Sequence, residues 1–208
     1  MPAQITPTPN GPLQAENIPA LKNDRGDTLS TEATLYLCRC GASQNKPYCD
    51  GSHTPAKFSD KRLRGPGRPP AEFVGRDITV VDDVSLCAHA GACVEGAPDT
   101  FFTLEAGQRV SQPDASPAET VIAAIRRCPS GALLYKRQGK LVQDYAATTE
   151  IRVEKDGPYL VQRAQLAGPA QPATADHYTL CRCGASLNKP FCDGMHAKVK
   201  FRDGSGSV

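Results

Sequence analysis

The sequence predicts an α+β protein built from several small domains: a β-rich domain at each end and a different α+β domain between them. Three observations lead to this prediction. A sixteen-residue block that begins at Cys38 recurs from Cys181, the segments that precede the two copies also match, and a helix-start signal lies in the stretch between them. A repeat that extends beyond its cysteines indicates a duplicated domain.

The composition favours small domains over one large core. The 208 residues are 39% hydrophobic, with six Phe, six Tyr and no Trp, and the 18 Pro and 18 Gly favour loops and turns. Small domains with much irregular backbone need extra stabilisation, such as a metal or disulfides. The nine cysteines are an odd number and too sparse for a disulfide scaffold, so metal binding is the better interpretation.

The repeated block carries a metal-ligand pattern. Both copies read C-R-C-G-A-S-x-N-K-P-[YF]-C-D-G-x-H. Three thiolates and one imidazole suit a tetrahedral soft metal site, either zinc or an iron-sulfur cluster. Intervals of two, nine and four residues differ from the usual zinc-finger spacing, which favours iron-sulfur over a pair of zinc knuckles. The candidate ligands are Cys38, Cys40, Cys49 and His53 in the first copy and Cys181, Cys183, Cys192 and His196 in the second.

Each end domain reads as strand, Gly-Pro turn, strand, loop and third strand. Residues 5–13 in the first copy correspond to residues 151–159 in the second, and both contain Gly-Pro. The third strands are expected at Thr34–Leu37 and His177–Leu180, where each chain segment enters its first cysteine pair. His177 is expected on the surface of its strand.

The residues around the third cysteine suggest a turn followed by a short helix. Pro47 and Pro190 are expected to fix the turn that returns this cysteine to the first pair. Asp50 and Asp193 then offer a side-chain acceptor at a helix start. The free N–H groups of a helix N-terminus favour negative charge, which suits a cluster of thiolates.

The pattern C-x-C-x2-S-x3-P-x-C-D-G-x-H resembles that of the CDGSH iron-sulfur domain family, also called NEET proteins. The first copy meets it in full, and the second departs at Met195, which is not a ligand position. The resemblance implies a 2Fe-2S cluster in each block and an interlocked β core shared by two such domains. With both copies in one chain, we expect an intramolecular pseudo-dimer.

The spacing also suggests how the ligands divide. Cys38 and Cys40 are two apart on an extended segment, so they point to one side and can bind one iron, while Cys49 and His53 bind the other. A neutral imidazole in place of a thiolate raises the reduction potential. Protonation of the histidine competes with iron, so the potential and cluster retention should depend on pH.

The middle segment predicts a separate α+β domain after a Pro- and Gly-rich linker. Strands are expected at residues 78–81, 101–104 and 109–111. A helix is expected from a Ser116 cap, with Pro117 at its first position, through to Arg127. The expected boundaries are 1–63 for the first end domain, 64–71 for the linker, 72–138 for the middle domain and 139–208 for the second end domain.

The cysteines of the middle domain are arranged as in a single-cluster bacterial ferredoxin, with a near group and a distant Cys-Pro. The middle cysteine of the near group is missing, and Ala90 takes its place. C-x-H-x-G-x-C followed by C-P-S-G-A-L resembles the divergent mono-cluster 4Fe-4S family over about residues 72–138. The resemblance implies ligands at Cys87, Cys93 and Cys128 and a ferredoxin-like fold. Three thiolates suffice for a 3Fe-4S cluster, whereas a 4Fe-4S cluster needs a fourth ligand. His89 is the nearest candidate for that ligand; its alternative role is a hydrogen bond to a cluster sulfide.

The remaining charges and motifs give no reason to expect an enzyme. No nucleotide-binding or hydrolase motif is found, and the nine cysteines are all assigned to the three sites. The net charge of +2 favours neither nucleic acid nor membrane binding. Arg39, Arg182, Lys46 and Lys189 lie beside the ligands, where they either offset cluster charge and attract an acidic partner or are solvated loop charges.

We therefore expect an electron-transfer protein of the bacterial cytoplasm whose partner is a redox protein. The alternative is a donor or store of iron-sulfur clusters that serves an apo-iron-sulfur protein, and a third class is a structural zinc module. The start of the sequence lacks the features of a secretory signal or a mitochondrial presequence. A monomer with an internal pseudo-dimer is the expected assembly.

Overall fold

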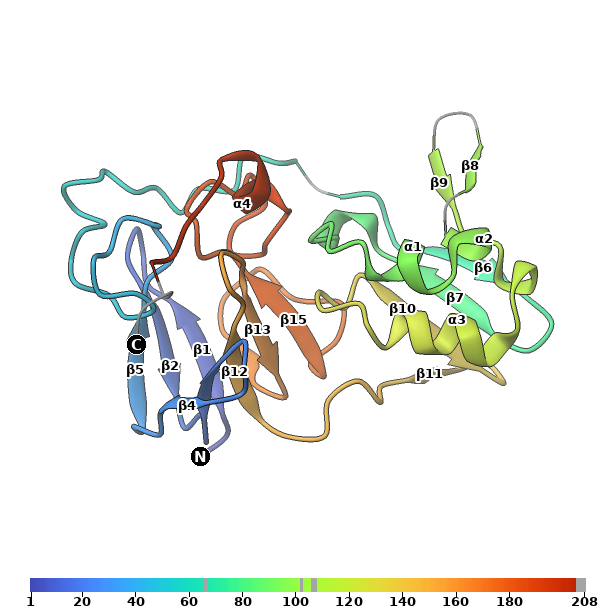
Figure 1. The fold of residues 1–208 in the computed structure, drawn as a ribbon, viewed down its shortest axis with the longest axis horizontal. Coiled ribbons are helices and arrows are strands. Elements are labelled where there is room, and N and C mark those ends of the chain that lie inside the picture. Colours follow the sequence, from blue (N-terminus) through green and yellow to red (C-terminus); the bar gives the residue numbers. More distant parts are fainter. Residues whose placement is uncertain (66, 102, 106–107, 205–208) are drawn as a thin grey trace.

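The computed structural model describes residues 1–65, 67–101, 103–105 and 108–204. Figure 1 shows two units side by side: a β-rich unit formed by both ends of the chain, and a middle domain with helices and a sheet. The predicted α+β class is confirmed, with small sheets and short helices throughout.

The β-rich unit contains two sheets, and each sheet combines strands from both chain ends. One has the order β14-β1-β2-β5 and the other β15-β13-β12-β3-β4. Two parallel strand pairings join the halves: β1 pairs with β14, and β3 pairs with β12. The strands are β1 Gln4–Pro7, β2 Leu13–Glu16, β3 Leu21–Asn23, β4 Thr28–Ser30, β5 Thr34–Leu37, β12 Glu150–Val153, β13 Tyr159–Gln162, β14 Gln165–Leu166 and β15 His177–Leu180.

The strand predictions for the two ends agree with these bounds. Each half forms an antiparallel hairpin across its Gly-Pro turn, β1 with β2 and β12 with β13. The third strands, β5 and β15, cover the predicted residues and pair with β2 and β13. In β5 burial alternates, with Leu35 and Leu37 in the core and Tyr36 outside. All four residues of β15 are buried. The prediction that His177 lies on the surface of this strand is therefore wrong.

The two halves also meet where each first cysteine pair ends. Cys40 and Cys183 form an isolated antiparallel bridge. Gly41 and Gly184 follow with positive φ angles of +82° and +78°. A methyl group on Gly41 would lie 2.5 Å from the Cys183 carbonyl oxygen, and one on Gly184 would lie 2.3 Å from that of Cys40. Only glycine satisfies both the backbone angle and this close approach.

The predicted helix after the third cysteine exists in the second copy as the short α4 Met195–Lys198, whereas residues 51–57 of the first copy form turns. Gly194 occupies the N-cap, but the predicted side-chain acceptor is present, because Asp193 Oδ1 accepts from the Met195 N–H at 3.3 Å. The second oxygen of each carboxylate bonds across its loop: Asp50 accepts from the Gln44 N–H at 2.8 Å, and Asp193 accepts from the Leu187 N–H at 2.9 Å.

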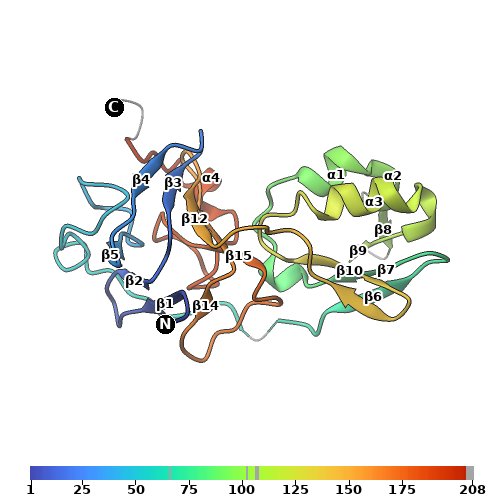
Figure 2. The same ribbon diagram turned by 90° about the horizontal axis from the view of Figure 1, so that it is seen from below.

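The middle domain is a four-stranded sheet of order β11-β10-β7-β6, with helices along one face, as Figure 2 shows. Buried Val121, Ile122 and Ile125 of α3 belong to the same hydrophobic core as Val80 and Leu133 of the sheet. The elements are β6 Ala71–Val74, β7 Thr79–Asp82, the 3-10 helix η1 Val84–Leu86, α1 Ala92–Gly96, α2 Pro98–Phe101, β8 Thr103–Glu105, β9 Gln108–Val110, the 3-10 helix η2 Pro113–Ala115, α3 Ala118–Ile125, β10 Leu133–Arg137 and β11 Lys140–Val142.

Several predicted boundaries in the middle domain shift. Phe101 ends helix α2, and the hairpin β8–β9 begins two residues later; residue 102 of the predicted strand lies outside the described residues. Helix α3 has Pro117 as its N-cap, because Ser116 is extended, and it ends at Ile125, before the predicted Arg127. The sheet also reaches beyond the expected range of 72–138, since it includes Ala71 and β11.

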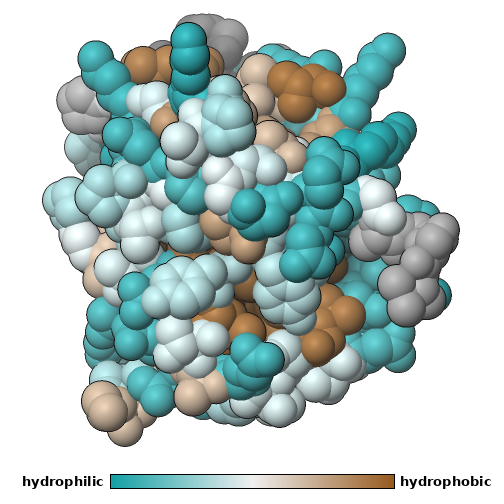
Figure 3. All heavy atoms as spheres, turned by 90° about the vertical axis from the view of Figure 1, so that its left-hand side faces the viewer, coloured by the Kyte–Doolittle hydropathy of each residue, from teal (hydrophilic) through white to brown (hydrophobic). Residues whose placement is uncertain are grey.

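No helix in the described parts of the chain is long and apolar enough to cross a membrane. The end of the molecule farthest from the middle domain shows a mainly hydrophilic surface with scattered apolar side chains (Figure 3).

The glycine contact between the halves predicts a specific loss of stability. Alanine at a positive φ costs about 1–2 kcal/mol by itself, and Gly41→Ala adds a steric clash with the other half, so we expect about 3 kcal/mol or more in total. For a chain of this length the melting temperature should fall by about 6–12 °C.

The matched control is Gly26→Ala, because Gly26 also has a positive φ, +91°, with nothing within 4 Å of the added methyl. Its melting temperature should fall by about 2–8 °C, and in the same protein preparation by less than that of Gly41→Ala. Equal losses in the two variants, measured by circular dichroism, would show that the glycine contact does not hold the halves together.

Candidate metal centres

The structure brings the predicted ligands of each repeated block together as two pairs. In centre 1, defined as Cys38, Cys40, Cys49 and His53, the first two sulfurs are 3.6 Å apart, and Cys49 Sγ lies 3.4 Å from His53 Nδ1. Centre 2 comprises Cys181, Cys183, Cys192 and His196; its corresponding distances are 3.8 Å and 3.4 Å.

These distances suit pairs of ligands on one tetrahedral ion. Two sulfurs bound at about 2.3 Å lie about 3.8 Å apart, and a sulfur and a nitrogen lie about 3.5 Å apart. Within the described residues, no three His, Cys, Asp or Glu side chains are grouped closely enough for one ion. In each centre the first two cysteines are therefore spaced as ligands of one ion, and so are the third cysteine and the histidine.

The loops that carry the ligands are closed by hydrogen bonds from the cysteine backbone. The Cys38 N–H donates to the Pro47 carbonyl and the Cys181 N–H to the Pro190 carbonyl, both at 2.8 Å. These bonds return the third cysteine to the first pair, which is the turn that we predicted from Pro47 and Pro190. Ala42 N–H donates to Cys40 Sγ at 3.4 Å, a contact that stabilises a thiolate.

Burial and hydrogen bonding control which groups of centre 2 ionise. A hydrogen bond from Cys181 lowers the pKa of Cys183 to about 7, so this thiol is the first of its pair to lose a proton. Burial raises the pKa of Cys192 to about 12. Burial also lowers the pKa of His196, which keeps the imidazole neutral, the form that binds a metal. Metal binding at centre 2 must therefore release protons from thiols.

The arginine between the first two cysteines of each block is buried and holds the loop in place. Arg39 is 3% exposed, and its guanidinium donates to the carbonyls of Gly11 at 2.7 Å and Thr8 at 2.6 Å. Arg182 makes the equivalent bonds to Gly157 at 2.9 Å and Glu154 at 2.5 Å. Neither arginine is a solvated loop charge, and neither is placed to attract a partner from solution.

The two lysines of the loops are also held in place by hydrogen bonds, so they are not free surface charges. Lys46 Nζ donates to the Ser43 carbonyl at 2.5 Å, and Lys189 Nζ donates to the Ser186 carbonyl at 2.7 Å. Each ammonium also lies near a ring of the opposite half, Lys46 near Phe201 and Lys189 near Phe58. Both cations therefore stabilise the contact between the halves.

The middle centre, defined as Cys87, Cys93 and Cys128, lies in a pocket that the three cysteines line together with His89 and Arg109. Cys87 follows η1, Cys93 lies in α1 and Cys128 follows α3. Arg109 forms a bidentate ion pair with Asp82, at 2.6 Å and 3.0 Å, and its Nη1 lies 4.0 Å from Cys87 Sγ. A fixed cation therefore stands beside the thiols, while burial raises the pKa of Cys93.

His89 lies at the rim of this pocket. Its backbone has a φ of +56°, and its side chain is exposed. A methyl group on Gly194 would lie 3.2 Å from His89 Cβ, so this histidine also contacts the loop of centre 2. The structure brings it to the three cysteines but gives no bond between it and any of them.

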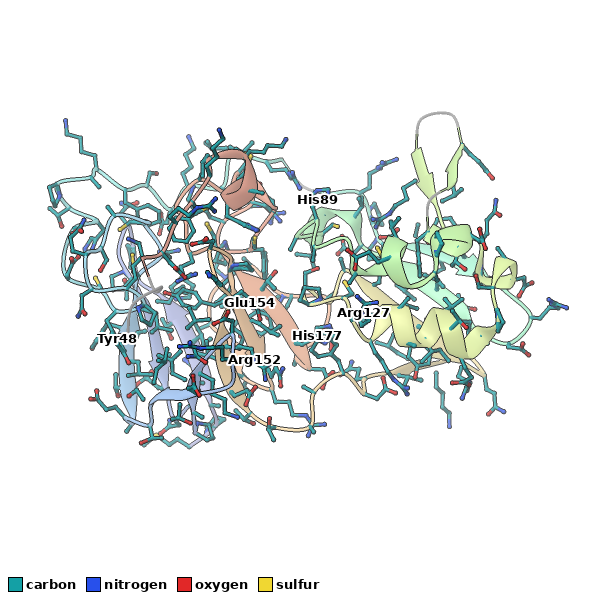
Figure 4. All side chains as sticks on the ribbon, in the orientation of Figure 1. Tyr48, His89, Arg127, Arg152, Glu154 and His177 are labelled. Atoms are coloured by element: carbon teal, nitrogen blue, oxygen red, sulfur yellow. The ribbon has the colours of Figure 1, made fainter. Side chains whose placement is uncertain are left out.

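Sequence reasoning missed the part played by His177. Its Nε2 lies 2.9 Å from the Cys128 carbonyl oxygen, and its ring stacks on Tyr145 at 3.8 Å. Figure 4 shows His89 and His177 at the boundary between the β-rich unit and the middle domain. The sequence did contain a signal for this role, since His177 precedes Cys181 on the same strand and has no counterpart in the first copy.

Sequence reasoning also missed the role of Tyr159. Its hydroxyl lies 2.7 Å from the Cys38 carbonyl and 3.0 Å from that of Pro47, so a side chain of the second half supports the loop of centre 1. Burial raises its pKa well above the ordinary value, which keeps the hydroxyl a donor. The first half has Leu13 at the corresponding position.

Comparison with known proteins agrees with these centres. The family described as iron-binding zinc finger CDGSH type matches residues 10–54 and 156–197, and the family described as divergent 4Fe-4S mono-cluster matches residues 73–138. Two curated relatives, both called uncharacterized protein YjdI, come from Escherichia coli strains K12 and O157:H7. Each is 35% identical over 66 residues, which is 32% of this chain and 84% of the relative. No solved structure matches the chain.

The matched segments contain every candidate ligand, and the CDGSH segments flank the mono-cluster segment as the repeat predicted. The chain is therefore an iron-sulfur protein of the CDGSH family, with a divergent 4Fe-4S mono-cluster domain between its two CDGSH domains.

Proposed function

We propose that this chain is an electron-transfer protein with no catalytic site of its own. In this proposal centres 1 and 2 each hold a 2Fe-2S cluster, and the middle centre holds a 3Fe-4S or 4Fe-4S cluster. The observation that carries the proposal is that the three ligand loops contact one another in sequence. Bound clusters of these types supply one-electron redox chemistry.

The pairing of ligands supports two irons in each CDGSH centre. Two cysteine sulfurs at tetrahedral spacing form one half of a centre, and a cysteine with a histidine forms the other. The imidazole presents Nδ1 toward its cysteine in both centres. This division is the one expected for a cluster with two thiolates on one iron and a mixed pair on the other.

The contacts between the centres support a relay. Centre 1 meets centre 2 at the bridge between Cys40 and Cys183. Centre 2 meets the middle centre where Gly194 faces Ala88 and His89. Each neighbouring pair of ligand loops is thus in direct contact, which gives the short separations that electron transfer requires.

The strand exchange between the chain ends supports an intramolecular pseudo-dimer. Each half contributes strands to the sheet of the other, and Tyr159 and the two lysines cross between them. All of these contacts form within one chain. We therefore infer that a single chain contains the complete pair of CDGSH domains.

A cluster donor is the second candidate function, and the exposure of centre 1 favours it. Asp50, Gly51 and Thr54 around its histidine are all exposed. A partner could therefore reach the His53 side of this centre without any opening of the fold.

Redox titration tests the electron-transfer proposal. The anaerobically purified protein should contain about seven or eight iron atoms and show at least two separated potentials, because the middle centre lacks the histidine of the other two. Iron analysis, EPR and optical titration measure these quantities. A colourless zinc protein, or iron without reversible reduction, would contradict the proposal.

A cysteine variant tests the middle centre. Cys93→Ser should remove about three or four iron atoms and leave the EPR signal of the 2Fe-2S clusters, because Cys93 is a candidate ligand of the middle centre alone. Cys49→Ser is the matched variant and should remove about two irons, with the signal of the middle centre retained. Loss of the same amount of iron in both variants would count against separate centres.

Cluster transfer tests the alternative. On mixing with an apo-ferredoxin, a donor should pass iron and sulfide to the acceptor, measured by the absorbance of the separated acceptor. Transfer that is absent while reversible reduction persists would leave electron transfer as the function.

A further inference from the structure

The two CDGSH centres have the same ligands, but the middle domain covers the loop of only one of them among the described residues. The clearest comparison is between the matched glycines of the D-G-x-H motif. A methyl group on Gly194 would lie 3.1 Å from the Ala88 carbonyl oxygen. A methyl group on Gly51, which has nearly the same φ, would meet nothing within 4 Å.

The same difference extends along the loops. Asn188 is fully buried, and its side-chain amide donates to the Ser85 carbonyl of the middle domain at 2.8 Å. The corresponding Asn45 is exposed. Asp193 is 6% exposed, whereas Asp50 is exposed to solvent.

The linker adds a second cover over centre 2. The backbone N–H groups of Leu63 and Arg64 both donate to the Leu187 carbonyl, at 2.9 Å and 2.8 Å. The guanidinium of Arg64 also lies 3.9 Å from the Asp193 carboxylate. The loop of centre 2 is therefore held between the linker and the middle domain.

A third contact joins the other side of centre 2 to the middle centre. His177 begins the strand that leads into Cys181, and its ring bonds to the Cys128 carbonyl. This histidine is 3% exposed. Both cysteine segments of centre 2 are thus linked to the middle domain, one through His177 and one through Asn188.

The order of the parts in space agrees with these contacts. Strand β15 of the second half lies between the first half and the middle domain in both ribbon views (Figures 1 and 2). The middle centre keeps an open rim, since Ala90 and Gly91 are exposed.

From these contacts we infer that centres 1 and 2 are not equivalent: centre 2 is an internal relay paired with the middle centre, and centre 1 is the terminal that meets an external redox protein. The inference rests on the proposed electron-transfer function. It assigns the external docking surface to the exposed loop at residues 44–54 and excludes the covered loop of centre 2 from that role.

The order in which the centres lose metal tests this inference on the intact holoprotein. With excess EDTA and iodoacetamide near neutral pH, Cys49 should be alkylated at least about tenfold faster than Cys192, because access to Cys192 requires local opening of the cover. Peptide mass spectrometry measures both rates in one sample. Equal rates, or faster alkylation of Cys192, would overturn the inference and leave the redox titration unaffected.

A matched pair of variants tests whether the middle domain is the cover. Asn188→Ala removes the bond to Ser85, so the rate at Cys192 should rise about threefold or more, which is what the loss of one hydrogen bond allows. Asn45→Ala should change neither rate, because its side chain is exposed. A similar effect of both variants, or none in Asn188→Ala, would overturn the assignment of the cover.

EPR supplies a measurement that needs no variant. After the fast phase of metal loss, the reduced protein should keep about half of its 2Fe-2S signal, because centre 2 is covered whereas centre 1 is open. Loss of the whole 2Fe-2S signal in the fast phase would overturn the inference.

Discussion

The structure depends on the close approach of two backbone corners, Cys40-Gly41 and Cys183-Gly184. Each glycine faces the carbonyl of the cysteine in the other half, so neither position has room for a side chain. The corners carry one ligand of each centre, and they bring the two centres to opposite sides of a single contact. Strand exchange and the lysine–phenylalanine contacts reinforce an arrangement that this approach fixes.

The buried arginines explain why the repeat extends well beyond the ligands. Each guanidinium needs acceptors once it is removed from water, and the Gly-Pro turn of the same half supplies them. Arg39 bonds to the Gly11 carbonyl and Arg182 to the Gly157 carbonyl. A carboxylate near the end of each half completes the set, Asp60 for Arg39 and Asp203 for Arg182. The hairpin, the ligand loop and the closing segment therefore form one unit around a single cation.

The sequence was sufficient for the features that depend on local pattern. The third strands before Cys38 and Cys181 follow from alternation and position, and the spacing of each block predicts which cysteines and histidine lie near one another. Features that depend on neighbours in space were not accessible in the same way. Asn45 and Asn188 occupy identical motif positions, yet one is exposed and the other is buried by a domain about 100 residues away in sequence. His177 was predicted on the surface because the local pattern does not show that the middle domain covers it.

The start of α4 differs from the simple cap for a different physical reason. Asp193 uses one oxygen for the Met195 N–H at the helix start and the other for the Leu187 N–H across its loop. Gly194, between them, takes the left-handed conformation at the N-cap. The bond across the loop depends on the closed loop, which the motif letters alone do not describe.

Equal ligands in centres 1 and 2 do not imply equal potentials, because the surroundings differ. Cys192 is 3% exposed, whereas Cys49 is partly open to solvent. Reduction adds a negative charge, and that charge is more costly where water is excluded. The covered centre 2 should therefore accept an electron less readily than the open centre 1. The middle centre, held by cysteines without the histidine pair of the CDGSH loops, is expected to lie lower still. For the proposed relay, the order of burial and ligand type predicts a direction, from the middle centre through centre 2 to the exposed loop of centre 1.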